Sequence, residues 1–219
     1  MRTKDCIKMK SRHPLREFTL FSILAIGLSG CALVNVAGEA APELYVLSAP
    51  VLEPLPTGTA TTKPTILVSD FAAPAAIDTT RILYQPTPNE VKYYAGARWT
   101  DSVPKMVHGL LVETLDKSGG AIALDDRSLV LKSEFELVGD IRRFGASPNA
   151  EGKSVVDVAM IVRLVRASDR SIVDARSFEA SATTKGSGMK PVIEAYNEAL
   201  GITVADITAW SISAASTGR

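Results

Sequence analysis

The chain has 219 residues, with 24 Lys and Arg against 24 Asp and Glu. This length is enough for one domain with a sizeable hydrophobic core. Two cysteines in the whole chain exclude a disulfide-rich fold.

The N-terminus has the three parts of an export signal in their usual order. Residues 1–17 are basic, residues 18–28 carry no charge, and the sequence Leu28-Ser29-Gly30-Cys31 follows. The apolar run is too short to span a bilayer, which needs roughly 20 residues. The last four residues look like a bacterial lipobox, in which signal peptidase II cleaves before an acylated cysteine. We therefore expect a signal peptide over 1–30, cleavage between Gly30 and Cys31, and lipidation of Cys31. The alternative is a buried helix with a chance cysteine.

Cleavage would change the composition of the remaining chain. The leader contains six of the basic and two of the acidic residues, so the mature chain has a net charge of about −4, which argues against nucleic-acid binding. Cys31 and His108 would be the last cysteine and histidine, so we expect no disulfide, no metal site and no cofactor. Two or three acyl chains hold a protein firmly to a membrane, at about 0.8 kcal/mol per buried methylene. Ala32, in place of the aspartate that retains lipoproteins in the inner membrane, favours the periplasmic face of the outer membrane. Met9 is an alternative start.

Residues 31–43 are small and mostly uncharged, and we expect a tether there. The first half of the mature chain then predicts strands over 43–48 and 64–71 and a hairpin over 81–99. An amphipathic helix is predicted over 100–120, since Pro104 suits a first turn and Gly119 ends the apolar stripe.

The second half alternates apolar and polar residues in three long runs and ends in a second amphipathic stretch. We expect strands over 121–126, 129–144, 153–167 and 171–184, followed by a helix over 189–214. The order of these elements predicts a single domain over 44–219. Its expected class is α+β, a mostly antiparallel sheet with two amphipathic helices packed on one face.

Two other features have plain interpretations. His108 is the one candidate base for a Ser-His-Asp site, but it lies off the centre of its helix's apolar stripe, and we interpret it as a solvated or half-buried histidine. The sequence "KGSGMK", 185–190, lacks the spacing of a phosphate-binding loop. We interpret it as a strand-to-helix link in which Ser187 caps the helix.

Four aromatic residues gather in the predicted hairpin: Tyr84, Tyr93, Tyr94 and Trp99. Tyrosine and tryptophan are favoured at interfaces, although packing in the core explains such a cluster as well. In a strand Tyr93 and Tyr94 point to opposite faces, so at most one of them can face the core. We expect a partner-binding surface formed by Tyr93, Tyr94, Arg98 and Trp99.

The sequence "RILYQPTPNEVKYYAGARWTDSVPKMVHGLLVETL", 81–115, together with the lipobox, "YVLS" and "ILVSDF", resembles a known family. It is similar to the ABC-type transport auxiliary lipoproteins, the PqiC/YmbA-like family that accompanies MCE transport systems. The resemblance implies a non-enzymatic outer-membrane component that docks an MCE-domain protein or another copy of itself. The transported substrate of such systems is lipid or another apolar molecule. The family supplies no catalytic residue to transfer to this sequence.

Two other functions stay open at this point. A lipid-anchored protein of this kind could serve envelope assembly or integrity, as a partner of a β-barrel or of the cell wall. A lipoprotein hydrolase is a third reading, which requires that His108 be catalytic.

Overall fold

The computed structural model describes residues 41–50, 62–125 and 132–218. The expected signal peptide, Gly30, Cys31 and nearly all of the tether lie outside these residues. Apart from Ala41, the described residues belong to one compact unit, Pro42–Arg219.

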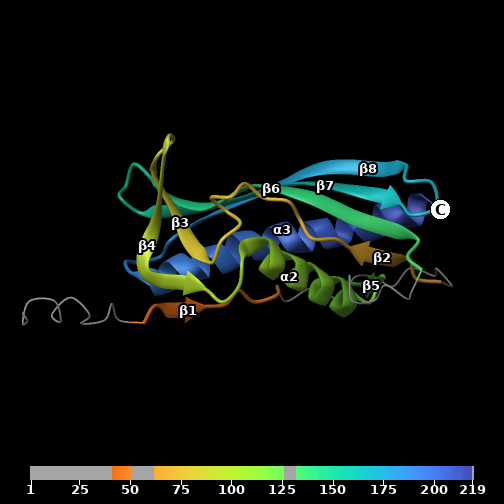
Figure 1. The fold of residues 1–219 in the computed structure, drawn as a ribbon, viewed down its shortest axis with the longest axis horizontal. Coiled ribbons are helices and arrows are strands. Elements are labelled where there is room, and N and C mark those ends of the chain that lie inside the picture. Colours follow the sequence, from red (N-terminus) through yellow and green to blue (C-terminus); the bar gives the residue numbers. More distant parts are fainter. Residues whose placement is uncertain (1–40, 51–61, 126–131, 219) are drawn as a thin grey trace, which may run out of the picture. The chain divides into compact units, whose positions relative to one another are not determined.

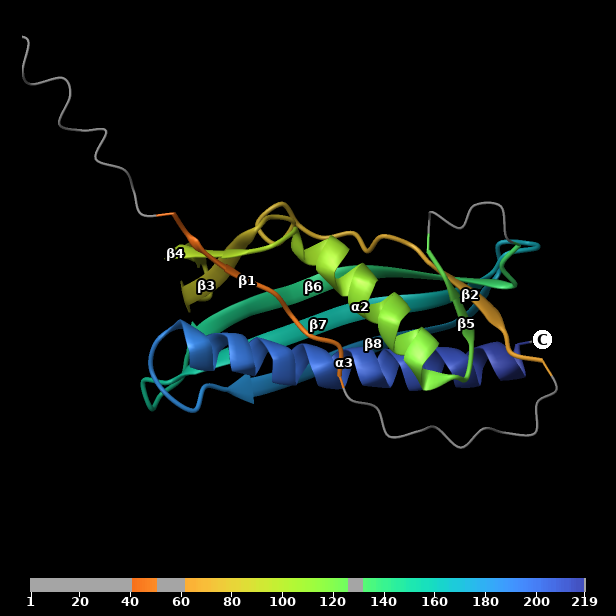
Figure 2. The same ribbon diagram turned by 90° about the horizontal axis from the view of Figure 1, so that it is seen from below.

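Within the described residues, eight strands form one sheet, and two helices lie together on one side of it (Figures 1 and 2). In chain order the elements are β1 (Glu43–Tyr45), β2 (Thr65–Val68), β3 (Arg81–Thr87), β4 (Glu90–Trp99), α2 (Val103–Ser118), β5 (Ile122–Leu124), β6 (Phe135–Pro148), β7 (Ser154–Arg166), β8 (Ile172–Thr183) and α3 (Met189–Thr217). The α+β class and the two helices agree with the sequence prediction.

The sheet is mixed, so the expectation of a mostly antiparallel sheet was wrong. Antiparallel pairing joins β3 to β4, β6 to β7 and β7 to β8, where short turns connect neighbours. Parallel pairing joins β1 to β4, β2 to β5, and both β2 and β3 to β6. The parallel pairs come from long connections, which allow distant strands to meet in either direction.

Strand β6 organises the sheet because it carries neighbours on both edges. One edge pairs with β7 along its whole length. The other edge pairs with β2 near Phe135 and with β3 at Ala146. Two positions of β6 are glycine because a side chain fills the space beside them: a Cβ at Gly139 would lie 2.4 Å from the Phe71 ring, and one at Gly145 would lie 2.5 Å from Leu83.

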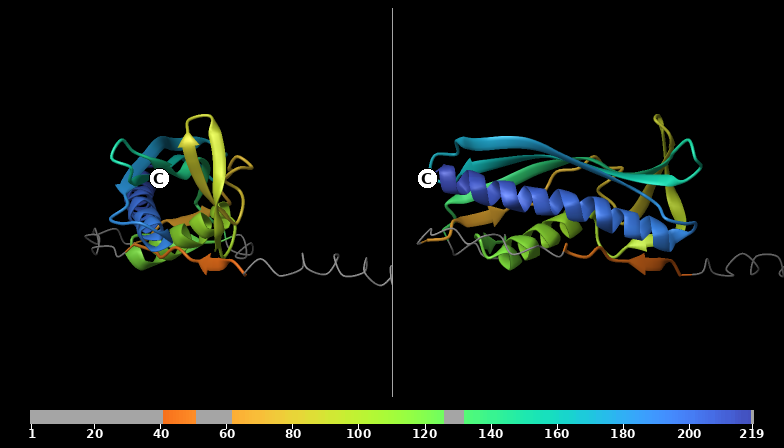
Figure 3. Two further views of the ribbon diagram at one scale, coloured as in Figure 1. Left: turned by 90° about the vertical axis from the view of Figure 1, so that its left-hand side faces the viewer. Right: turned by 180° about the vertical axis from the view of Figure 1, so that it is seen from behind.

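The core lies between the sheet and the helices. Helix α3 packs along β7 and β8, and α2 packs on α3, β2 and β5. Figure 3 shows α3 running beneath the long strands, while the tip of the β3–β4 hairpin projects away from the helix side. Helix α3 is also long and apolar enough to cross a membrane, but more than half of its most apolar window is buried against the rest of the unit. Such burial is typical of a core helix.

Candidate functional site: the aromatic arm and its groove

The β3–β4 hairpin, called the aromatic arm below, separates its two adjacent tyrosines. In the register of the hairpin, Leu83 lies opposite Tyr93 and Tyr84 lies opposite Lys92. The side of the sheet that carries Leu83 and Tyr93 faces away from the helices. Tyr84 is opposite the buried Ala146 of β6 and faces the helix side, where Tyr94 joins it.

Tyr93 is held by its immediate neighbours. The Arg81 guanidinium carbon lies 3.8 Å from the centre of the Tyr93 ring, and the Tyr93 hydroxyl donates to the Ala76 carbonyl over 3.2 Å. A cation stacked on the ring and a hydrogen bond at its tip together fix this side chain. Tyr93 therefore acts first as a packing residue of the arm.

Tyr94 occupies a different environment on the other side of the strand. Its ring centre lies 5.5 Å from that of Tyr84, at an interplanar angle of 50°. Burial raises the pKa of the half-buried Tyr94 hydroxyl, and a hydrogen bond with the Ser154 side chain acts in the opposite direction. Tyr94 is thus a neutral, partly exposed tyrosine with apolar area and a polar tip, which is the character of an interface residue.

Trp99, at the end of the same strand, belongs to the core. It is 1% exposed, and its ring centre lies 5.0 Å from that of Tyr196 and 6.2 Å from that of Phe144. A partner therefore cannot reach Trp99, although the sequence analysis grouped it with the binding residues. Arg98 is exposed and lies between Leu44 of β1 and Arg81 of β3 in the sheet.

Beside Tyr94 the surface is hollowed into a groove of about 580 Å³. The arm contributes Tyr94 and Ala95, the turn before β7 contributes Gly152 and Lys153, β7 contributes its first residue, Ser154, and the rest comes from residues 184–189 and Val192. The ends of β7 and β8 close the groove through paired contacts of Ser154 and Thr184, in which each backbone N–H donates to the other residue. Lys153 and Lys185 also line the groove. Lys153 Nζ lies 3.3 Å from a Glu151 carboxylate oxygen, and Lys185 Nζ lies 3.2 Å from one of Glu198.

The segment 185–190 forms one wall of this groove, and its capping differs from the prediction. The N-cap of α3 is Gly188, with φ of 91° and no side-chain hydrogen bond, so Ser187 is not the cap. Positive φ explains a glycine at this position, because other residues adopt it at a cost.

His108 is buried rather than solvated. Its Nε2 lies 3.0 Å from the Val68 carbonyl oxygen. Since a carbonyl can only accept, Nε2 carries the hydrogen, and the contact ties α2 to β2. No group of three or more His, Cys, Asp or Glu side chains able to hold a metal ion occurs within the described residues.

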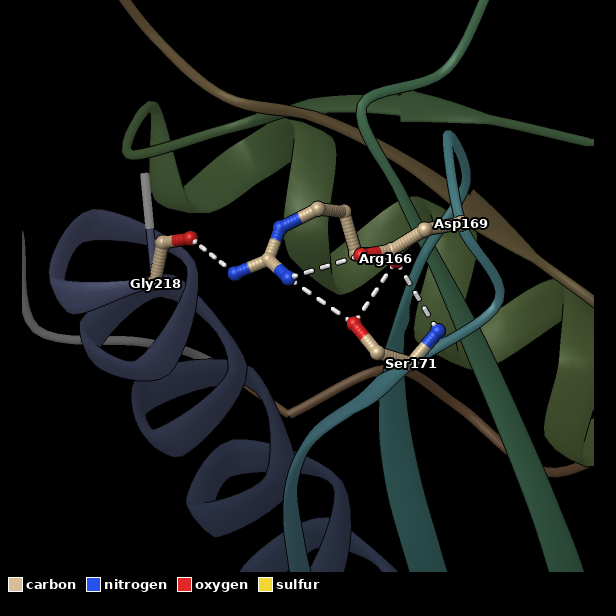
Figure 4. Close-up of polar contacts among 4 residues, drawn as sticks. All are labelled: Arg166, Asp169, Ser171 and Gly218. Carbon is tan, nitrogen blue, oxygen red and sulfur yellow. Dashed lines mark hydrogen bonds and ion pairs between the residues drawn. The ribbon is translucent and has the colours of Figure 1, made fainter.

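A second hollow, of about 780 Å³, lies at the other end of β7. Both terminal nitrogens of Arg166 have partners there (Figure 4): the guanidinium donates to the Ser171 hydroxyl over 2.8 Å and to the Gly218 carbonyl over 2.7 Å, and Asp169 lies 3.6 Å away. Hydrogen bonds from Ser171, together with the charge of Arg166, hold the pKa of Asp169 below its usual value. These contacts attach the C-terminal end of α3 to the β7–β8 turn, and a cation suits that end of a helix. The cluster therefore has a structural role.

The arrangement retains part of the expected surface and adds residues that the sequence did not suggest. Tyr94 is placed in a concave surface, Tyr93 and Arg98 lie on the other side of the arm, and Trp99 is removed to the core. Lys153, Ser154, Thr184 and Met189 were missed. The sequence pointed to some of these residues only through the glycine-rich segment 185–190 before the last helix. Nothing in that pattern shows that the segment lies beside the aromatic arm.

Comparison with known proteins gives a family and a fold. Residues 45–208 match the family described as the ABC-type transport auxiliary lipoprotein component. The uncharacterized protein bll6063 of Bradyrhizobium diazoefficiens is 24% identical over 149 residues, which cover 68% of this chain and 40% of that protein. The match thus spans less than half the length of this relative.

Two solved structures share the architecture. Protein XCC0632 from Xanthomonas campestris has a TM-score of 0.70 at 22% identity, covering 80% of this chain and 98% of that one. An uncharacterized protein of known structure has a TM-score of 0.60 at 14% identity, covering 78% and 99% of the two chains. At these identities the likeness establishes the fold.

Proposed function

Because this chain belongs to the family of ABC-type transport auxiliary lipoprotein components, we propose that it is the lipid-anchored, non-enzymatic member of an MCE transport system. In this proposal Cys31 is acylated and holds the domain on the periplasmic face of the outer membrane. The domain docks an MCE-domain protein that bridges the periplasm, and the system carries lipid or another apolar substrate.

The observation that carries the docking proposal is the groove beside Tyr94. A half-buried tyrosine at the edge of a concave surface offers area and a polar tip to a partner, and such residues are enriched among interface anchors. The backbone of a glycine-rich segment lines it, and its two lysines are already paired with Glu151 and Glu198, so a partner segment that offers backbone hydrogen-bonding groups would fit. The contacts of Tyr93 and His108 within the unit account for those side chains without a further role.

The docking proposal is tested by replacing each tyrosine alone. Tyr94→Ala should weaken binding of the MCE-domain protein by about thirtyfold, the loss of roughly 2 kcal/mol typical of a central anchor, measured at a temperature at which the variant is fully folded. Tyr93→Ala is the matched control: it should lower the melting temperature, because it loses the Arg81 and Ala76 contacts, and should leave affinity unchanged for the folded protein. Equal effects of both changes on binding, or none, would place the docking surface elsewhere.

The anchor is tested separately. Mass spectrometry of the protein from membranes should show a chain that begins at Cys31 and carries acyl groups, and Cys31→Ser should leave an unlipidated form. A wild-type chain that retains residues 1–30 would contradict the anchor. Purification of the lipidated protein with a β-barrel or with cell-wall material, and without an MCE-domain protein, would favour the role in envelope assembly.

A further inference from the structure

We propose that β1 and its neighbours form a second surface, distinct from the groove, that lies flat on an anionic lipid membrane. The proposal rests on the lipid anchor at Cys31 proposed above. The surface is called the β1 face below and consists of Leu44, Val46, Arg98 and Arg81.

The β1 face begins with two exposed apolar side chains. Leu44 is 65% exposed and Val46 is 63% exposed, whereas Leu47 is buried and Tyr45 is half-buried. This alternation places Leu44 and Val46 on the same outward side of the chain. Strand β1 is at the edge of the sheet, and the Ser48 amide donates to Asn197 of α3 over 2.9 Å, so the segment is fixed across the outside of the unit (Figure 2). The β1–β4 pairing and the Ser48–Asn197 hydrogen bond therefore fix the backbone so that both apolar side chains point outward.

Two arginines continue the same face into the sheet. Leu44 is in register with Arg98 of β4, and Arg98 is in register with Arg81 of β3. Residues in register lie on one side of a sheet, so the three side chains form a row. Both arginines are exposed, and neither forms an ion pair within the described residues. The Arg81 guanidinium stacks on the Tyr93 ring and keeps its N–H groups for a lipid phosphate, whereas Arg98 has no such ring contact in the described part of the chain. Glu43, the residue before Leu44, pairs with Ala97 in the adjacent row and accepts a hydrogen bond from Tyr45.

Apolar side chains beside unpaired guanidinium groups match the chemistry of a membrane surface. The apolar side chains enter the region between headgroups and acyl chains, and the guanidinium groups bind lipid phosphates. Each arginine near an anionic membrane strengthens attachment by about fivefold, at roughly 1 kcal/mol per basic residue. Alone such a surface binds weakly, but an acylated protein already holds it near the bilayer at a high effective concentration.

The length of the intervening chain brings the face within reach of the membrane. Thirteen residue steps separate Cys31 from Leu44, so an extended chain spans at most about 45 Å. The residues at the far end of this linking chain, Leu44 and Val46, belong to the β1 face. The surface nearest to the anchor in sequence is thus the one whose side chains suit a lipid.

The experiment uses the lipidated protein reconstituted in vesicles that contain a nitroxide-bearing phospholipid as a depth quencher. The mature chain would have no free thiol, so Val46→Cys can be labelled with a polarity-sensitive fluorophore at one position. Ile172→Cys, at a side chain that is 59% exposed on β8, is the matched control site. We expect quenching and a blue shift at Val46 in vesicles of phosphatidylcholine mixed with phosphatidylglycerol, and neither at Ile172.

Charge variants then test the lipid partner. Arg98→Gln should reduce the docked population about fivefold in the anionic vesicles, and added salt should act in the same direction. Arg176→Gln, at an exposed arginine of β8 that lies over the Phe178 ring, should have no effect.

Each remaining outcome overturns the proposal. Protein that floats with the vesicles and shows no quenching at Val46, or equal quenching at both sites, leaves the anchor intact and removes the β1 face. A blue shift without nitroxide quenching that grows with protein density would identify a second copy as the occupant. Protein that lacks acyl groups by mass spectrometry and does not float removes the anchor and the β1 face together.

Discussion

The two halves of β4 use the same residue types for different purposes. In the first half, Tyr93 and Tyr94 are half-buried, and Tyr94 borders the groove. In the second half, Trp99 is enclosed by Phe144 and Tyr196, and β1 pairs alongside. An aromatic residue of this strand belongs to the core where α3 and β1 cover it and to the surface where they do not. Coverage by elements distant in sequence, rather than residue type, decides the role.

The largest expected effect tests whether the second half is core. Trp99→Ala should destabilise the fold by about 3 to 5 kcal/mol, because it removes a large side chain from a packed interior. Trp99→Phe should cost much less, since Nε1 of Trp99 has no hydrogen-bond partner within the described residues and a phenyl ring can keep an edge-to-face contact with Tyr196. Denaturant titration of the two variants measures the difference. If Trp99→Ala lost partner binding while keeping wild-type stability, the division of β4 proposed here would be wrong.

A smaller effect is expected where the two halves meet. The Tyr196 hydroxyl is buried and donates to the Leu83 carbonyl of β3 over 3.0 Å. Tyr196→Phe should cost about 1 to 2 kcal/mol of unfolding free energy, because the variant loses a buried hydrogen bond. Tyr84→Phe is the matched control: the Tyr84 hydroxyl has no hydrogen-bond partner within the described part of the chain, and its removal should change stability by less than about 0.5 kcal/mol.

The same residue predicts a dependence on pH. Burial raises the pKa of Tyr196 well above its usual value of 10.0. Unfolding exposes the phenol, which then ionises near pH 10, so this contribution to stability is complete below that pH and is lost as the pH rises toward the folded pKa. Denaturant titrations at neutral and alkaline pH should show a smaller alkaline loss of stability in Tyr196→Phe than in the wild-type protein. Equal losses would mean that other groups control the alkaline limit.

Local patterns predicted the elements well and their arrangement incompletely. The hairpin over 81–99, the two helices and the strands over 153–167 and 171–184 lie close to their predicted ranges, because periodicity and turn residues are properties of neighbouring residues. The strand predicted over 129–144 is instead β6, Phe135–Pro148, which begins six residues later. The parallel pairing of β2 and β3 with one edge of β6 was missed. It depends on where the connection over 69–80 leads, and no local period encodes that path.

The error on Trp99 has a specific cause in the backbone of β4. By strict alternation Trp99 would share a face with Tyr93, which faces away from the helices. Between the paired positions Arg81–Arg98 and Leu83–Tyr93, the single residue Ile82 of β3 lies opposite residues 94–97 of β4. This bulge contains Gly96 and moves Ala97 and Trp99 to the helix side, where both are buried. The four residues of β4 opposite one of β3 are three extra residues, and an odd number of extra residues reverses which face the following side chains occupy.

The bulge gives the smallest and most specific prediction. Gly96 has φ of 69°, and a Cβ there would meet nothing within 4 Å, so Gly96→Ala should cost about 1 kcal/mol through backbone strain alone. Gly109 is exposed within α2, also has open space around a Cβ and has no positive φ. Gly109→Ala should therefore stabilise the protein by roughly 0.5 to 1 kcal/mol. Gly96→Asn should recover part of the loss, since asparagine tolerates the left-handed region. Denaturant titration separates these opposite signs. A stabilising Gly96→Ala would mean that the backbone at the bulge is not fixed. The bulge would then not be what places Tyr94 at the groove and Trp99 in the core.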